Sequence, residues 1–138
     1  MDLIETGIEG YIAAWNTLGR NTLGFEVVYS DPESNTYVNH IKDNINYFLE
    51  YLEYTHLDLV SLDMDLEEFS IRDIGIETDN AVLVSALETI IITAKYRDNY
   101  YLYDDYIYEE VFEDAPSADV FYRLIKEGGE WRIDSKFY

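Results

Sequence analysis

Carboxylates are the most abundant side chains in this sequence that could do chemistry, and they gather in two stretches. The chain carries 29 Asp and Glu against 9 Lys and Arg, a formal net charge of −20. Residues 43–71 and 98–122 contain no Lys or Arg. Carboxylates can transfer protons, ligate hard cations, or accept hydrogen bonds from the Arg and Lys side chains of a partner. Each use predicts a different residue pattern.

The densest carboxylate cluster, formed by Asp63, Asp65, Glu67 and Glu68, begins like a calcium-binding loop. In an EF-hand the sixth loop position is Gly and the twelfth is Glu. Here these positions hold Glu68 and Ile74, so the pattern excludes an EF-hand and favours a solvated acidic loop. We therefore expect no metal and no cofactor. Because there are so many acids, no pair can be singled out for glycosidase-type catalysis.

Other catalytic patterns are also missing. His40 and His56 are the only histidines, and neither has a second metal ligand at helical spacing. His40 lies beside the core-facing Ile41 of a predicted helix, and His56 lies at the end of that helix, where a cation suits the helix dipole. The sequence has no cysteine and no Gly-x-Ser-x-Gly turn. We predict no catalytic residue and no enzymatic activity.

Tyrosines alternate with acids in residues 98–122, which gives two interpretations. A strand with one buried face produces such alternation. An interaction face does so too, because Tyr supplies amphipathic contact area while acids receive Arg and Lys. With the first acidic cluster included, the predicted partner-binding residues are Asp63, Asp65, Glu67, Glu68, Tyr101, Tyr103, Asp104, Asp105, Tyr106, Glu109, Glu110, Glu113 and Asp114.

The charge predicts the class of partner. A net charge of −20 repels nucleic acid and anionic membranes and attracts basic protein surfaces. If the fold brings the two acidic stretches together, their surface would imitate nucleic-acid phosphates and occupy the basic groove of a nucleic-acid enzyme. The alternative is that the acidity serves solubility alone.

The elements that must position these residues follow from apolar spacing. Spacings of three and four predict helices over about 3–18 and 34–55, whereas 22–29 fits a short helix or an extended piece. Strands are predicted over about 68–77, 81–96, 100–113, 118–126 and 130–137, with Gly128 and Gly129 in a hairpin turn. Helices followed by a meander of strands predict a single α+β domain over 1–138, with N-terminal helices on one face of an antiparallel sheet of four to five strands.

Two motifs add a family resemblance. The run GYIAAWN at 10–16 resembles the first helix of NTF2-like domains, and YRLIKEGGEWRI at 122–133 resembles their final hairpin. The long helix and long strands between them are similar to the extracytoplasmic NTF2-like domains of TcaA-type Gram-positive membrane proteins. The resemblance implies a curved sheet wrapped around helices as a cone. It implies no function, because this fold carries enzymes, transport factors and inert modules, and the pocket Asp of ketosteroid isomerase-like members has no match here.

Three functions remain open on this basis. The first is a non-enzymatic, cytoplasmic inhibitor or immunity-type factor that covers a basic surface of another protein. The second is an extracytoplasmic module of a Gram-positive membrane protein that binds or senses a cell-envelope component. The third is a small NTF2-like enzyme acting on an apolar ligand. No apolar run approaches the ~20 residues of a membrane span, and the open face of the sheet would allow a homodimer.

Overall fold

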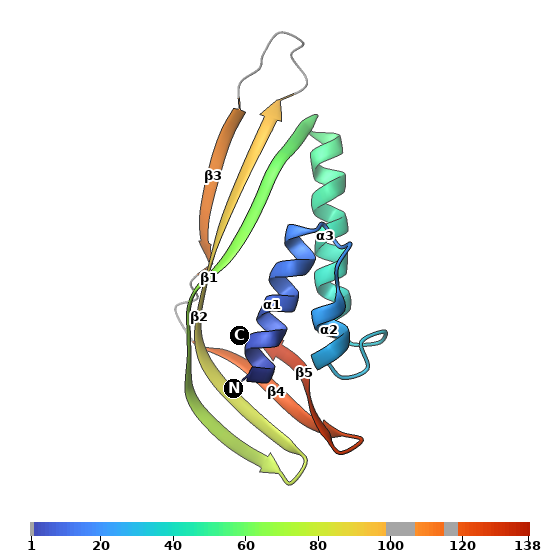
Figure 1. The fold of residues 1–138 in the computed structure, drawn as a ribbon, viewed down its shortest axis with the longest axis vertical. Helices are drawn as coiled ribbons and strands as arrows, with labels where there is room; N and C mark the ends of the chain where they lie inside the picture. Colours follow the sequence, from blue (N-terminus) through green and yellow to red (C-terminus); the bar gives the residue numbers. More distant parts are fainter. Residues whose placement is uncertain (1, 99–106, 115–118) are drawn as a thin grey trace.

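Three helices precede an antiparallel sheet in this protein, whose computed structural model describes residues 2–98, 107–114 and 119–138. The helices are α1 (Asp2–Asn16), α2 (Leu23–Val28) and α3 (Thr36–Tyr54). The strands are β1 (Leu57–Thr78), β2 (Ala81–Asp98), β3 (Ile107–Asp114), β4 (Val120–Glu127) and β5 (Glu130–Phe137). The helices lie against the concave side of the curved sheet (Figure 1). The predicted α+β class, with N-terminal helices on one face of a curved antiparallel sheet, is confirmed.

Helix α3 begins at a side-chain cap that also joins it to the sheet. The Asn35 Oδ1 accepts hydrogen bonds from the backbone N–H groups of Tyr37 and Val38, at 3.0 and 3.1 Å. The Asn35 Nδ2 donates to the backbone oxygens of Ser30 and Asp134, at 3.0 and 2.8 Å. An N-cap of this kind satisfies N–H groups that the first turn leaves without partners. One buried side chain thus fixes both the start of α3 and its position beside β5.

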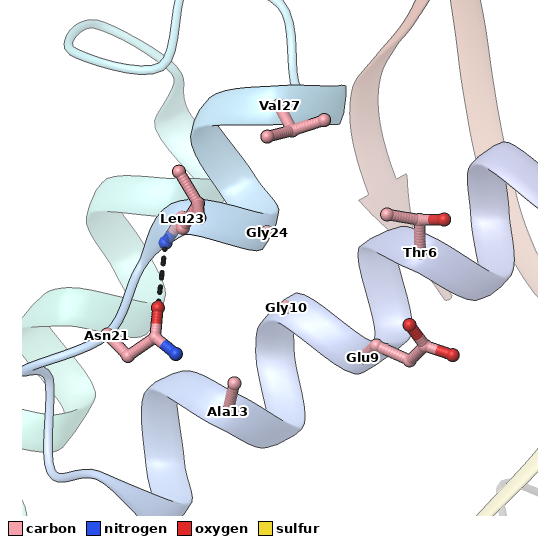
Figure 2. Close-up of a pocket in the computed structure, with 8 residues that line it drawn as sticks. All are labelled: Thr6, Glu9, Gly10, Ala13, Asn21, Leu23, Gly24 and Val27. Carbon is pink, nitrogen blue, oxygen red and sulfur yellow. Dashed lines mark hydrogen bonds between the residues drawn. The ribbon is translucent and has the colours of Figure 1, made fainter.

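Helices α1 and α2 cross at two glycines, which settles the ambiguous segment 22–29 as helical. A Cβ atom added to Gly10 would lie 2.8 Å from the backbone carbon of Gly24, closer than real Cβ contacts allow. Figure 2 shows this crossing, with Ala13 and Val27 beside the two glycines on their own helices. The close approach lets Phe25 of α2 bury its ring completely. Glycine at these positions therefore serves packing between helices.

We expect Gly24→Ala to lower the free energy of unfolding by about 1–3 kcal/mol, because the added methyl must push α1 and α2 apart. Urea denaturation followed by circular dichroism measures this change. The matched control is Gly75→Ala in β1, where the nearest atom to the new Cβ is the Leu83 oxygen at an ordinary 3.8 Å. Equal stability of the two variants would contradict close packing at the crossing.

The sheet is organised around β2, with β1 as a long edge strand. Strand β1 pairs along the whole of β2. On the other side of β2, β3 pairs with residues 90–97 and β4 with residues 81–86, and β5 then pairs with β4. Four register shifts interrupt the β1–β2 ladder, one of them between Ile71 and Asp73. Bulges of this kind bend a strand and increase its twist, which fits the curvature in Figure 1.

The beginning of the first strand differs from the sequence prediction. Strand β1 begins at Leu57 rather than near residue 68, so the acidic cluster lies in a strand and not in a loop. Asp63 and Asp65 are exposed while Met64 between them is buried, as expected for alternating sides of a strand. Strand β3 begins at Ile107 in the described part, and the predicted strand residues 100–106 lie outside it.

Candidate functional site

A buried carboxylate, Glu88 of β2, joins three strands on the concave side of the sheet. Its Oε1 accepts a short hydrogen bond from the Tyr122 hydroxyl of β4. Its Oε2 lies 2.6 Å from the Nζ of Lys136 on β5. The Glu88 and Lys136 side chains are only 4% and 5% exposed. The Lys136 ammonium also lies 5.5 Å from the ring centres of both Tyr11 and Tyr122, within cation–π range.

Buried tyrosines surround this ion pair. Tyr29 stacks on Tyr37, with ring centres 5.5 Å apart. Burial, followed by the negative charge of Glu88, raises the pKa of Tyr29 far above its usual value near 10. Burial also raises the pKa of Tyr122, with further contributions from the charge of Glu88 and its hydrogen bond. For Tyr37 the same direction results from burial first and then from neighbouring tyrosines. These three hydroxyls stay protonated at neutral pH.

The Glu88 cluster ties β2 to β4 and β5 in the interior. Both Glu88 oxygens are engaged there, because Oε1 accepts a hydrogen bond from the Tyr122 hydroxyl and Oε2 pairs with the Lys136 ammonium. A hollow of about 200 Å³ lies beside Lys136, lined by Thr36, Tyr37, His40, Ser135 and Lys136. This described lining includes no carboxylate. His40 is exposed there and lies 3.3 Å from the Asn44 amide.

A second, apolar cavity separates two hydrophobic clusters of the interior. The larger cluster lies between α1, α2, the start of α3 and the sheet, and the smaller one surrounds Leu52, Ala94 and Tyr96. The cavity between them has about 220 Å³ and is lined by Tyr11, Trp15, Phe48, Leu62, Met64, Ile92, Ala94 and Tyr96. Its described lining holds no carboxylate and no histidine, the groups that proton-transfer enzymes place in such pockets.

The structure brings the two acid-rich stretches to opposite sides of one segment of β2. On β1, Asp63 pairs with Thr93 and Asp65 with Ile91. On β3, Val111 pairs with the same Thr93 and Glu113 with the same Ile91. Because Asp63, Asp65 and Val111 occupy these rows, their side chains share the convex face of the sheet. Asp63, Asp65, Glu67 and Glu68 are all exposed, and none has an ion-pair partner among the described residues.

Basic side chains interrupt this acidic face. Lys95 lies between β1 and β3, and its Nζ is 3.7 Å from Glu109. Glu110 is exposed but pairs with Ala94, which places it on the other face of the sheet. The remaining predicted residues are not described in full. Tyr101, Tyr103, Asp104, Asp105 and Tyr106 lie outside the described residues, and only the backbone positions of Glu113 and Asp114 are described.

Helix α3 carries a further group of tyrosines and acids that the sequence reasoning missed. Tyr47, Tyr51 and Tyr54 are 69%, 57% and 86% exposed. Their spacing of four and three places them on one side of the helix. Asp43 and Glu50 share this side, and with Asn46 and Tyr47 they line an open hollow of about 280 Å³. The spacing is readable in the sequence, but tyrosines at helical spacing fit a buried stripe as well as an exposed one.

The described helices and curved antiparallel half-barrel sheet form an α+β fold, which fits the cone that the NTF2-like resemblance implies. The chain is similar to the crystal structure of the intermembrane space region of the chloroplast protein ARC6, with a TM-score of 0.56 and 13% identity over 98% of this chain and 89% of the other. It is also similar to a ketosteroid isomerase-like protein from Erwinia carotovora atroseptica, with a TM-score of 0.42 and 11% identity over 98% and 91% of the two chains. The first likeness supports the fold alone. The second is too weak to support a structural or functional conclusion.

Sequence comparisons add no function to this fold. No protein-family model matches the chain, and no curated protein matches it. The narrower resemblance to TcaA-type domains stays a prediction. In the described part of the chain, no helix is both long and apolar enough to cross a membrane. The described residues also contain no group of three or more His, Asp or Glu arranged to hold a metal ion.

Proposed function

We propose that this chain is a non-enzymatic binding protein that covers a basic surface of another protein, as an inhibitor or immunity-type factor does. The observation that carries the proposal is the convex face where β1 and β3 flank β2. Asp63, Asp65 and Glu68 are exposed there without ion-pair partners in the described structure. Val111, 60% exposed, lies in the same rows. Acids around an apolar contact form the pattern of an interface that receives Arg and Lys.

The interior of the protein supports binding rather than catalysis. Its buried carboxylate, Glu88, is held by Tyr122 and Lys136, and its apolar cavity is lined without an acid or a histidine. A partner with a groove rich in Arg and Lys fits the acidic face best, and nucleic-acid enzymes carry such grooves for phosphate contacts. For this role we propose a cytoplasmic location.

A second candidate function is an extracytoplasmic module that binds a component of the cell envelope. The likeness to a region named for the intermembrane space of an organelle is the observation that favours it. Under this candidate the acidic face serves solubility, and capture of basic proteins would not depend on it.

A charge-reversal experiment separates these candidates. The variant Asp63→Lys/Asp65→Lys/Glu68→Lys is compared with a control, Glu5→Lys/Glu9→Lys/Glu33→Lys, which reverses three exposed acids outside the sheet. Both change the net charge from −20 by +6, to −14. Each protein is used in a pull-down from native lysate at low and high salt, and retained proteins are identified by mass spectrometry.

We expect the wild type and the control to retain the same basic protein at low salt and to release it at high salt, because exposed charges are screened. The β1 variant should bind that protein at least about tenfold more weakly, since like charges now face each other. If the β1 variant retains the basic protein as well as the wild type does, and high salt does not release it, the proposal is contradicted.

A further inference from the structure

We propose that the outer side of α3 is a docking surface for an arginine-bearing segment of a partner protein. We define this α3 surface by Tyr47, Tyr51 and Tyr54 together with Asp43 and Glu50. The proposal deepens the proposed function and rests on it, because it names a second surface and a chemical preference for the same class of basic partner. The α3 surface shares no residue with the acidic face on β1 and β3.

The tyrosine side chains of the α3 surface are unusually exposed and have no partners among the described residues. At 69%, 57% and 86% exposure, Tyr47, Tyr51 and Tyr54 leave most of their rings in water. None of the three side chains makes a hydrogen bond or ring contact with a described residue. Tyr is enriched at the energetic centres of protein interfaces, where its ring is buried and its hydroxyl stays paired. Three such rings on one helix side provide apolar area that only a partner can bury.

The acids of the α3 surface are equally free. Asp43 and Glu50 have no ion-pair partner among the described residues, and no Lys or Arg occurs from residue 43 to residue 71. In each ion pair of the described structure, the acid is either a residue of the sheet or Asp119 beside it. The α3 surface thus keeps its full negative charge. Charge complementarity therefore requires a basic occupant and disfavours a second copy of this acidic chain.

The combination of rings and carboxylates distinguishes arginine from lysine. A guanidinium group can stack on a tyrosine ring while its N–H groups bind a carboxylate in a bidentate manner, whereas a lysine ammonium acts as a compact point charge. Asp43, Asn46, Tyr47 and Glu50 line an open hollow of about 280 Å³ in which one guanidinium can meet both a ring and an acid. The side from Asp43 to Tyr54 extends for roughly 16 Å along the helix at 1.5 Å per residue. That length matches three turns of a helical partner segment.

The position of α3 leaves this side accessible. Helix α3 contacts α1 and the sheet through buried residues such as Ile41, Ile45 and Leu52. In Figure 1 its C-terminal half forms the outer layer of the helical side, and no described element lies beyond it. A partner segment can therefore align with residues 43–54 without any rearrangement of the fold.

The test uses two labelled helical peptides that carry Arg or Lys at every fourth position and are otherwise identical. Binding is measured by fluorescence anisotropy at about 0.15 M salt, where long-range attraction between exposed charges is largely screened. Three proteins are compared after circular dichroism has confirmed their helix content. They are the wild type, the variant Tyr47→Gln/Tyr51→Gln/Tyr54→Gln, and the variant Tyr47→Phe/Tyr51→Phe/Tyr54→Phe. All three have the same net charge.

We expect the wild type to bind the Arg peptide more tightly than the Lys peptide. The Gln variant should lose about tenfold of its affinity for the Arg peptide and lose the preference for Arg, because exposed cation–π contacts are lost together. The Phe variant should keep both, since its rings remain. Equal binding of the Arg peptide by the wild type and the Gln variant, or equal binding of Arg and Lys peptides by the wild type, would overturn the inference.

These results are separable from those on the proposed function. The tyrosine variants leave β1 and β3 unchanged. If they do not alter peptide binding, only the inference about the α3 surface is contradicted. Failure of the wild type to capture any basic protein in a salt-sensitive manner removes the proposed function, even if the Arg peptide binds α3.

Discussion

Replacement of Glu88 with Ala is expected to lower the free energy of unfolding by about 3–5 kcal/mol, because it leaves the Lys136 ammonium buried without its counter-charge. The Lys136 side chain is only 5% exposed, so its contact with solvent compensates little for the lost carboxylate. The Tyr122 hydroxyl loses its acceptor in the same step. Small domains are usually stable by only 5–15 kcal/mol, so this loss is a large share of the total. Urea denaturation followed by circular dichroism gives the free energy of each variant.

Two further variants show whether charge is the cause. Glu88→Leu/Lys136→Met removes both charges and should recover most of the lost stability, since apolar side chains can replace a buried ion pair. At the surface, Glu130→Ala breaks the pair with Arg132 at 3.0 Å, and its cost should stay below about 1 kcal/mol. A double variant no more stable than Glu88→Ala would show that packing, and not the unpaired ammonium, determines the cost.

The helical part of the fold was predictable because its signals are local. The apolar spacing of α3 and the break before it placed a helix over about 34–55, and the structure has Thr36–Tyr54. Gly10 lies inside the helical pattern of α1, where glycine indicates a close neighbour, and it contacts Gly24 of α2. The hairpin turn at Gly128 and Gly129, both with positive φ, joins β4 and β5. These features depend on residues close together in the chain.

The beginning of β1 was not predictable from simple alternation, because bulges repeatedly shift its pattern. Apolar residues alternate within short segments, but the spacing becomes three at 59–62, 66–69 and 71–74. Each of these steps coincides with a register shift in the ladder with β2. A bulge adds one residue to one strand only, so the buried face resumes one position later. The start of β1 therefore resembled a loop in the sequence, because its alternation is interrupted and many acids lie within it.

The buried ion pair was not predictable because its members are far apart in sequence. Glu88 is one of 29 acids, and its partner Lys136 lies 48 residues away on another strand. One signal was present, since Glu88 stands within the apolar strand segment 82–94, where a charge needs a partner. The identity of that partner depends on how β2, β4 and β5 align. The same holds for the α3 surface, because the sequence shows the spacing of its tyrosines but not which side of the helix faces the sheet.

Stability is expected to fall steeply above pH 10, because Tyr29, Tyr37 and Tyr122 must remain protonated in the folded state. Burial, with the charge of Glu88 as a further contribution, raises the pKa of all three hydroxyls in the folded protein, whereas in the unfolded chain they titrate near 10. The unfolded state therefore loses protons first as pH rises. The stabilising contribution is fully present below pH 10 and is lost above it. Each tyrosine should cost about 1.4 kcal/mol per pH unit there, or about 4 kcal/mol for the three.

Free energies of unfolding measured at pH 9, 10 and 11 test this dependence. The variant Tyr29→Phe removes one of the three buried hydroxyls without a charge change, so its stability should fall only about two-thirds as steeply above pH 10 as that of the wild type. The control Tyr54→Phe alters an 86% exposed side chain and should leave the pH dependence unchanged. If the wild type is equally stable at pH 9 and 11, or if Tyr29→Phe and Tyr54→Phe respond alike, the buried tyrosines do not control alkaline stability. The expected difference between the two variants assigns that control to the tyrosines around Glu88, because both substitutions remove the same hydroxyl group and differ only in its burial.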